Sequence, residues 1–538
     1  MLLIVGWKKW LVFVLGFWVA VLAPLACSAQ ETSRLGSGAY GVQYRPDTAT
    51  YRTFESDHFD LIYQEGALDM ARRTAWALEN SWPKTDSVVG PVPSGLHMPV
   101  VINNYNDRSN GFVHPFPFRQ EIEAPSIKSA PLVARSSSWP ALVAPHELVH
   151  AAHAEVHGGV GVGGLFDLFA PDIARSLNLL APSGFVEGVA VYRESQIEPG
   201  AGRLNAPLFT MKMKAAVLSD DPWSLTQMLE SPSYTQPFNR FYIGGAHAFE
   251  YLAERGDSVS TAFFQSAVTW HNRLPVLGHG VWLGLGTGQF PYQIGDEIQS
   301  ELRTTYQNEL AGRAPFTSTT LVSGARGLNH RRPYWIDEET LIAYVHGYDV
   351  RPGFYRIDAE TGERTPIRVQ ELTEDRTYSL GPDTSAIYAS RYVQDPLVPT
   401  QEIAEVERVQ LSTGRATRLT DEGRALAPVV ANGTIHAVTN DGPFTRWAVV
   451  TEAGHTRPLP PDVARSIRQL APSPRDSTMA VLVHEDGKQR LYRAEAPAAE
   501  PVQLTPWVGL KDAIIYDVSW GPTGRYLLFA ADLDETAN

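Results

Sequence analysis

The sequence predicts two domains of different class: an α+β domain over residues 30–315, followed by an all-β domain over residues 316–538. Three observations favour this division. Strand-like alternation of apolar residues comes before residue 103, helical spacing dominates from about 225 to 311, and short strands with turns recur after about Thr317. We therefore expect a sheet in the N-terminal half of the first domain and helices in its C-terminal half.

The individual elements of the first domain follow from the same patterns. In order, we expect a strand at 54–63, a helix at 67–82, a strand at 98–102, and helices at 225–229, 244–255 and 296–308. Residues 110–114 and 121–123 are candidates for the sheet edge that would pair with an extended peptide, or for an ordinary hairpin. The glycine-rich and apolar stretch 158–182 is interpreted as packed core, with a lid or a membrane-facing loop as alternatives.

The segment His146-Glu147-Leu148-Val149-His150 carries the clearest chemistry, because it is an HExxH motif. On a helix, residues four apart lie on one face about 6 Å apart along the axis, so both imidazoles can reach one zinc ion. Glu147 then points toward a water on the metal. Uncharged flanks are typical of a buried active-site helix. Because Pro145 is tolerated only in a first turn, we expect this helix to begin near Pro145.

A third ligand is expected from the helix-like segment 185–194, where Glu187 stands in the run Glu-Gly-Val-Ala-Val-Tyr. Two histidines and one carboxylate form the ligand set of a catalytic zinc site, which keeps one position open for water. The two segments together resemble the gluzincin metallopeptidases, those related to thermolysin and to aminopeptidase N. The resemblance implies zinc ligands His146, His150 and Glu187, with Glu147 as general base.

A further match to the aminopeptidase-N-like enzymes lies at Tyr242-Ile243-Gly244-Gly245. In those enzymes a Tyr-x-x-Gly segment supplies a hydroxyl that donates to the oxyanion, so the resemblance implies this role for Tyr242. A buried core tyrosine is the structural alternative, and Tyr234 is the reserve candidate. The chain lacks the Gly-x-Met-Glu-Asn segment with which those enzymes hold a free amino terminus, so aminopeptidase activity does not follow.

Two more histidines, His153 and His157, continue the face of His146 and His150. A metzincin would require HExxHxxGxxH, and Val156 stands where that pattern needs its last histidine. We therefore interpret His153 and His157 as neighbours of the ligands or as a solvated face, with a second metal site as the alternative.

Repeated units fill the last 200 residues. They open near Tyr334, Tyr378, Ala427, Leu470 and Val518, roughly 45 residues apart, which is the size of a four-stranded blade. Elements such as Thr-Gly-Arg-Ala-Thr-Arg-Leu-Thr and Gly-Pro-Thr-Gly-Arg-Tyr-Leu-Leu-Phe resemble the TolB-type β-propeller of bacterial envelopes. The fifth unit is short, so we expect four blades and part of a fifth, in an irregular or incomplete ring.

The first 29 residues have the composition of a secretory signal. Lys8 and Lys9 precede an apolar run over 10–26, and small residues precede an expected cleavage after Ala29. An uncleaved anchor and lipidation of Cys27 are the alternatives, and either would associate the chain with a membrane. Cys27 is the only cysteine, so the cleaved protein would form no disulfide and would suit the periplasm or cell envelope of a bacterium.

Composition and motifs together predict an enzyme. A net charge of −14 argues against a nucleic-acid partner, and 43% hydrophobic residues indicate a globular chain. We expect a zinc-dependent peptidase that binds one Zn²⁺ ion and hydrolyses a peptide or protein substrate with a metal-activated water. One alternative is an envelope binding or assembly protein whose propeller holds a protein partner and whose zinc site is structural or relict. Another is a zinc hydrolase of a non-peptide bond.

Overall fold

The fold is known from a computed structural model. It describes residues 44–537 apart from 90–95, 125–135, 137, 157–161, 180, 231–239, 269–277, 314–317, 319–321, 323–326, 348, 442–443, 460–465, 486–487, 496–501, 504–512 and 534–535. The predicted signal at 1–29, with Cys27, lies outside the described residues, as do Tyr234 and His157. Within the described part of the chain, no helix is long and apolar enough to cross a membrane.

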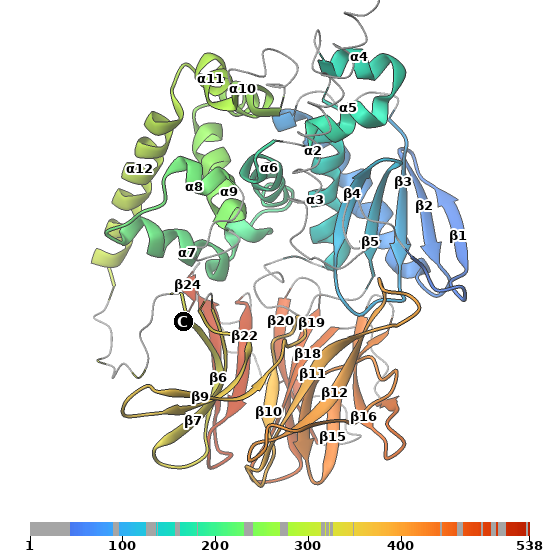
Figure 1. Ribbon diagram of the computed structural model, residues 1–538, viewed down its shortest axis with the longest axis vertical. Coiled ribbons are helices and arrows are strands. Elements are labelled where there is room, and N and C mark those ends of the chain that lie inside the picture. Colours follow the sequence, from blue (N-terminus) through green and yellow to red (C-terminus); the bar gives the residue numbers. More distant parts are fainter. Residues whose placement is uncertain are drawn as a thin grey trace, which may run out of the picture.

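A mixed five-stranded sheet forms one side of the first domain (Figure 1). Its strands are β1 (Tyr51–Glu55), β2 (Phe59–Gln64), β3 (Met98–Asn103), β4 (Gly111–Pro115) and β5 (Phe118–Glu123). The order is β1-β2-β3-β5-β4, with β2, β3 and β5 parallel and β4 antiparallel at the edge. The expected strand at 98–102 and the expected edge strand are thus confirmed, and 110–123 is also a hairpin.

The expected single strand at 54–63 is wrong, because this segment is a hairpin of β1 and β2. The backbone N–H of Ser56 donates to the carbonyl of Phe59 at 2.9 Å, and this bond turns the chain. Helices α2 (Leu68–Val89) and α3 (Trp139–Ala154) pack their apolar residues against the sheet in one continuous core. The sheet, α2 and α3 therefore form a rigid wall that carries the HExxH motif.

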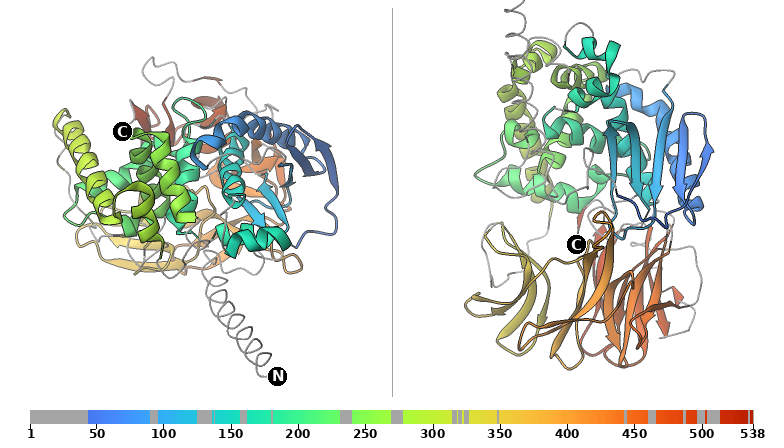
Figure 2. Two further views of the ribbon diagram at one scale, coloured as in Figure 1. Left: turned by 90° about the horizontal axis from the view of Figure 1, so that it is seen from above. Right: turned by 45° about the vertical axis from the view of Figure 1, so that its right-hand side comes forward.

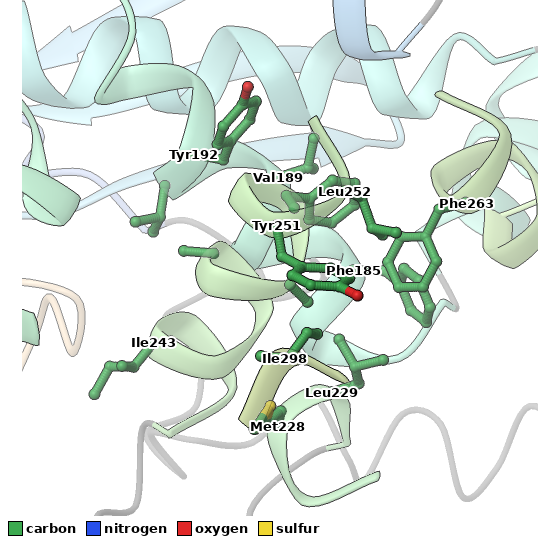
Figure 3. Close-up of a cluster of buried hydrophobic side chains, with 14 of the residues drawn as sticks. Phe185, Val189, Tyr192, Met228, Leu229, Ile243, Tyr251, Leu252, Phe263 and Ile298 are labelled. Carbon is green, nitrogen blue, oxygen red and sulfur yellow. The ribbon is translucent and has the colours of Figure 1, made fainter. Parts of the chain in front are cut away.

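Helices make up the other half of this domain. They are α6 (Ser183–Glu194), α7 (Pro207–Leu218), α8 (Leu225–Leu229), α9 (Arg240–Glu254), α10 (Asp257–Val268), α11 (Gly278–Thr287) and α12 (Pro291–Ala311). Figure 3 shows their shared core, in which Phe185 and Val189 of α6 meet Leu252 of α9 and Phe263 of α10. The predicted helices near 225, 244 and 296 are confirmed, with longer bounds for the last two.

The stretch 158–182 is packed core only in part: among its described residues, Ala174, Leu177 and Asn178 are buried. It contains the short helices α4 (Val162–Phe169) and α5 (Pro171–Asn178), at the end of the molecule away from the propeller (Figure 1). Leu165, Leu168 and Phe169 are 58%, 77% and 79% exposed. The reason is geometric: a short helix that is apolar on all sides can bury only the side that faces its neighbours.

The second domain is a β-propeller portion, as the repeats predicted. Its blades are β6–β9 (Asn329–Trp335, Thr340–His346, Gly353–Asp358, Arg364–Val369), β10–β13 (Tyr378–Leu380, Ala386–Gln394, Glu402–Gln410, Ala416–Arg418), β14–β17 (Ala425–Ala431, Thr434–Asp441, Phe444–Val450, Thr456–Pro458), β18–β21 (Ser466–Pro472, Thr478–Glu485, Lys488–Glu495, Val502–Gln503) and β22–β24 (Ile515–Trp520, Leu527–Leu533, Thr536–Ala537). Apolar clusters join neighbouring blades, and Arg332 Nη2 lies 3.5 Å from Asp517 Oδ1, which links the first blade to the fifth.

The propeller lies directly against the first domain (Figure 2). The loop 104–110, between β3 and β4, makes several of these contacts, and Asp107 at its centre is fully buried. The Asp107 carboxylate accepts from Arg424 Nε at 2.7 Å, from Asn440 Nδ2 at 2.6 Å and from the backbone N–H of Ala404 at 2.9 Å. Blades β10–β13 and β14–β17 thereby hold the loop that leads into the edge strand.

A buried acid in the sheet makes the stability of the fold depend on pH. Burial, reinforced by the nearby Glu121, raises the pKa of Glu123 to about 8. The folded chain binds the proton of Glu123 more tightly than the unfolded chain does. Protonation of Glu123 therefore contributes fully to the free energy of unfolding below the ordinary pKa of about 4.5, and this contribution is lost as pH rises through about 8. We expect the free energy of unfolding, measured with urea, to fall less between pH 5 and pH 8 in Glu123→Gln than in the unmodified protein. The exposed Glu55 provides the control variant Glu55→Gln, and equal slopes in all three proteins would contradict the assignment.

Candidate metal centre

The HExxH segment lies in the middle of α3, and the expected start of this helix near Pro145 is wrong. The helix begins at Trp139, where the Ser138 hydroxyl caps it by accepting from the backbone N–H of Ala141 at 3.3 Å. Pro145 lies inside the helix and costs it one backbone hydrogen bond. Nearly the whole helix is buried between the sheet and α6, and this burial offsets the cost. Rules based on local sequence do not include such burial.

Three donor atoms meet between α3 and α6. His146 Nε2 lies 3.2 Å from His150 Nε2, and each of these nitrogens lies 3.3 Å from Glu187 Oε2. A tetrahedral ion with bonds of about 2.0–2.1 Å holds its ligand atoms about 3.3 Å apart. The three side chains thus form a triangle of the size that a zinc ion requires, and they are a candidate metal site among the described residues.

Glu147 lies beside this triangle without joining it. Burial raises the pKa of its carboxyl to about 7, the value expected of a base that works near neutral pH. Its Oε2 atom is buried and has no hydrogen-bond partner among the described residues. A buried acceptor of this kind needs a donor, and a water between Glu147 and the metal ligands would supply one.

Strand β4 comes directly against Glu147 through Gly111. A Cβ atom added to Gly111 would lie 2.4 Å from Val143 Cγ2 and 3.1 Å from Glu147 Oε1, so only glycine fits. Strand β4, at one edge of the sheet, therefore begins at the candidate base, and its later residues Val113, His114 and Pro115 are buried. A peptide that paired with Gly111 would lie close to Glu147.

Two residues that sequence reasoning missed hold His146 in place. Glu194 Oε2 lies 2.9 Å from His146 Nδ1, and Arg203 pairs with both oxygens of Glu194, at 2.6 Å from Nε to Oε1 and 2.8 Å from Nη2 to Oε2. Burial alone would raise the pKa of Glu194, but the Arg203 guanidinium and its hydrogen bonds outweigh burial and hold that pKa at about 2. Glu194 is therefore an anion beside His146 Nδ1, which also lies 2.8 Å from Arg203 Nη2. When Nδ1 carries the proton and donates to Glu194, Nε2 of His146 is free to bind a metal.

A signal for Glu194 does exist in the sequence. It stands seven residues after Glu187, which places both carboxylates on the same face of α6. Arg203 lies in the short helix η2 (Arg203–Asn205) and has no such signal, because its role depends on a turn after α6. Gly188 of the Glu-Gly-Val-Ala-Val-Tyr run also has a structural role, since an added Cβ would lie 2.4 Å from the backbone of Gly245 in α9.

Tyr242 lies in the first turn of α9, near this network. The guanidinium carbon of Arg203 stands 5.4 Å from the centre of the Tyr242 ring, and the ring also contacts Phe241. The side chain is partly buried against the helical core. This neighbourhood is compatible with the oxyanion role that the resemblance implies, and that role stays a prediction.

Among the described residues, His153 is not one of the three donor residues of the candidate site. His153 is fully buried and packs edge-on against Phe264, with ring centres 4.6 Å apart. The solvated face is therefore wrong for His153, which packs in the interior between α3 and α10. Its role as a neighbour of the ligands stays a prediction. His157 lies outside the described residues.

The Glu194 contact leads to a prediction about metal binding. Glu194→Gln removes the anion that orients His146, and loss of such a partner typically weakens metal affinity about 10- to 100-fold. Competition with a chromogenic chelator would measure the affinity for Zn²⁺, and the melting temperature of the metal-free protein would report any general loss of stability. The control is Glu198→Gln, in the turn after α6. Unchanged Zn²⁺ affinity in Glu194→Gln would contradict this role.

Comparison with known proteins finds similarity only at the level of structure. No protein-family model matches the chain, and no curated protein matches its sequence. Solved structures that resemble it include TolB from Acinetobacter baumannii (17% identity, TM-score 0.30, covering 38% of this chain and 52% of that chain). They also include the β-propeller domain of the Trilobed protease from Pyrococcus furiosus (14% identity, TM-score 0.27, covering 39% of this chain and 64% of that chain).

An oligogalacturonate lyase in complex with manganese is similar to the same extent (18% identity, TM-score 0.28, covering 40% of this chain and 66% of that chain). The chain spans less than two thirds of the length of the first structures that it matches. Because all of these TM-scores are low, the propeller assignment rests on the observed blades themselves.

Proposed function

We propose that this protein is a zinc-dependent peptidase. The observation that carries the proposal is the triangle of His146, His150 and Glu187 donor atoms, with sides of 3.2–3.3 Å, beside a buried Glu147 oxygen that lacks a partner. This arrangement provides three protein ligands and an adjacent base, which is the minimum that a hydrolytic zinc site needs.

The protein residues would divide the work as follows. His146, His150 and Glu187 would hold one Zn²⁺ ion. When bound, such an ion lowers the pKa of water and polarises a carbonyl group. Glu147 would take the proton from the attacking water and give it to the leaving amine. Tyr242 would donate a hydrogen bond to the oxyanion, and one such donor typically contributes about 10²–10³ in rate.

Substrate would bind along the edge strand β4. Among the described residues β4 has no neighbouring strand on the side away from β5, so that side would take the peptide, and Gly111 keeps the strand in contact with Glu147. Main-chain pairing of this kind suits extended peptides of varied sequence. We further propose that the protein is exported to the periplasm or cell envelope, on the signal-like composition of residues 1–29, and that the propeller can contact an envelope protein.

The test is digestion of a mixed peptide library by purified protein loaded with Zn²⁺, with new termini read by mass spectrometry. We expect new termini that disappear when the metal is removed with a chelator and return when Zn²⁺ is added. The positions of the cuts distinguish an endopeptidase from an exopeptidase. Absence of any cleavage by metal-loaded protein would overturn the proposal and would favour a binding or assembly role.

A further inference from the structure

Exposed apolar side chains gather at the end of the first domain that lies away from the propeller. One group lies on the consecutive helices α4 and α5 and consists of Leu165, Leu168, Phe169 and Ile173. A second group lies on α11 and around the start of α12 and consists of Val281, Leu285, Phe290 and Tyr292. Figure 1 and the right-hand view of Figure 2 both place α4 and α11 at this end. Single exposed apolar residues are ordinary, but gathered ones indicate a surface that binds a partner.

The turn between β4 and β5 extends the first group, because it carries the exposed side chain of Phe116. The Arg175 guanidinium of α5 stands 4.5 Å from the centre of the Phe118 ring, at the first residue of β5, so this turn lies beside α5. Three segments that are far apart in the sequence therefore present apolar side chains at one end of the domain, namely 116–118, 165–173 and 281–292.

These segments carry almost no net charge. Helix α11 contains no Asp, Glu, Lys or Arg, and the only charged residue of α4 is Asp167. The charges of α5 are neutralised within the fold, since Arg175 pairs with Asp172 on the same helix and with Glu155 at the end of α3. A partner that is recognised by its charge would find little to bind here. The uncharged, apolar boundary of a lipid bilayer is complementary to such a surface.

Aromatic side chains in both groups also favour a bilayer as the partner. The rings of Phe290 and Tyr292 stack with their centres 6.2 Å apart, and Phe116 and Phe169 provide two further rings at the same end. Tyrosine is enriched where membranes meet water, because its ring can lie among apolar groups while its hydroxyl stays in water. A flat lipid surface can contact groups on separate helices at once, since lipids adapt to each group independently.

The sequence gives an independent reason to expect a membrane nearby. The apolar run at 10–26, which Lys8 and Lys9 precede, is of the kind that delivers a chain to a membrane for export. Residues 27–43 separate this run from Tyr44 and can span up to about 60 Å when extended. An exported chain of this sequence would fold beside a membrane, and an uncleaved run would keep the first domain within reach of the same bilayer.

We propose that α4, α5, α11 and the turn after β4 form a face that docks on the surface of a lipid bilayer. Leu165, Leu168, Phe169 and Leu285 would insert among the lipids at the boundary between head groups and acyl chains. The attraction is apolar and not electrostatic, so zwitterionic lipids are sufficient. This inference does not depend on the proposed peptidase activity, because none of these side chains belongs to the candidate metal centre.

The first experiment is flotation of the protein with phosphatidylcholine vesicles in a density gradient. It uses the chain from Gln30 onward, the form that the expected cleavage leaves, so that the run at 10–26 cannot bind the vesicles and every described residue is kept. We expect the protein to float with the vesicles and to stay bound in about 1 M NaCl, because salt screens charges and does not weaken apolar contacts.

A double variant tests the face itself. In Leu168→Ser, Phe169→Ser we expect the partition coefficient to fall about 10- to 100-fold, as loss of two inserted apolar side chains would cause. The matched control is Leu397→Ser, in the loop between β11 and β12 of the propeller, where Leu397 is 87% exposed. This control should bind vesicles as the unmodified chain does.

A fluorescence measurement avoids any loss of apolar residues other than the labelled one. Cys27 is the only cysteine, so the chain from Gln30 onward has none, and a single introduced cysteine can be labelled with a polarity-sensitive dye. The dye on Phe169→Cys should shift its emission to shorter wavelength when vesicles are added, and the dye on Leu397→Cys should not.

Four results would overturn the docking face: no flotation of the unmodified chain, its release by salt, full binding by the double variant, or unchanged emission of the dye at position 169. An emission shift that needs no vesicles and grows with protein concentration would show that a second copy of the chain covers this face, which would also overturn the proposal. No step of this test requires turnover, so a failure of the proposed peptidase function would leave its outcome unaffected.

Discussion

Glu147→Gln is expected to lower kcat for peptide hydrolysis by about 10²–10⁴-fold while Zn²⁺ stays bound. The amide has nearly the shape of the carboxylate, so α3 and its contacts with β4 remain. It cannot take a proton from water, and it lies beside the three donor atoms without being one of them. Steady-state kinetics on a cleaved library peptide and metal content by atomic emission would together measure both effects.

Two other variants make this result specific. His150→Ala removes a ligand, so it should lose both Zn²⁺ and turnover. Glu155→Gln changes the glutamate at the end of the same helix, which pairs with Arg175 away from the donor atoms, and it should retain both. Full activity of Glu147→Gln would show that the roles assigned here are wrong.

Asp107→Ala is expected to destabilise the protein by about 3–5 kcal/mol, as removal of one partner from a buried charge pair typically does. It leaves the Arg424 guanidinium, the Asn440 amide and the Ala404 N–H without their acceptor at a fully buried position. The loop 104–110 would then be held only by its remaining bonds, such as those of Asn106, Arg108 and Ser109 to the propeller, and the start of β4 would be less firmly fixed. We expect a lower midpoint of urea unfolding, faster proteolysis between the domains, and a reduced kcat/KM with Zn²⁺ still bound.

The milder Asp107→Asn keeps one acceptor oxygen and should lose less stability, on the order of 1–2 kcal/mol. Asp57→Ala, at an exposed position in the same domain, is the control and should change neither stability nor activity. An Asp107→Ala protein with the unfolding midpoint and proteolysis pattern of the unmodified chain would contradict the importance of this contact.

Local sequence rules predicted the parts of this molecule that depend on local spacing. The four-residue spacing of His146 and His150 correctly predicted that their side chains share a face of α3. The repeated units correctly predicted that consecutive stretches of the chain form consecutive blades of the propeller. The same rules failed at Pro145, because tertiary burial overrides a proline penalty of about 3 kcal/mol. They failed again at 54–63, where one backbone hydrogen bond turns an apparent strand into a hairpin.

Contacts between distant segments were beyond those rules. Arg203 reaches His146 across 57 residues, and Asn440 reaches Asp107 across 333 residues. The local sequence around His146 and around Asp107 does not indicate these distant partners. Asp107 in particular stands in a polar loop whose sequence is typical of exposed turns, and only the assembled propeller buries it.

The long sequence separation between Asp107 and its partners also limits the order in which parts of the chain can fold during synthesis. All residues of the candidate metal centre except Tyr242 precede residue 204, whereas the groups that hold the loop 104–110 belong to residues 374–440. Long-range contacts of this kind form late and slowly, because a large loop of chain must close first. The ligands can therefore gather on a partly synthesised chain, but the strand beside Glu147 receives its anchor only after two blades of the propeller have folded. A chain that stops before those blades would carry the metal ligands beside an unanchored edge strand.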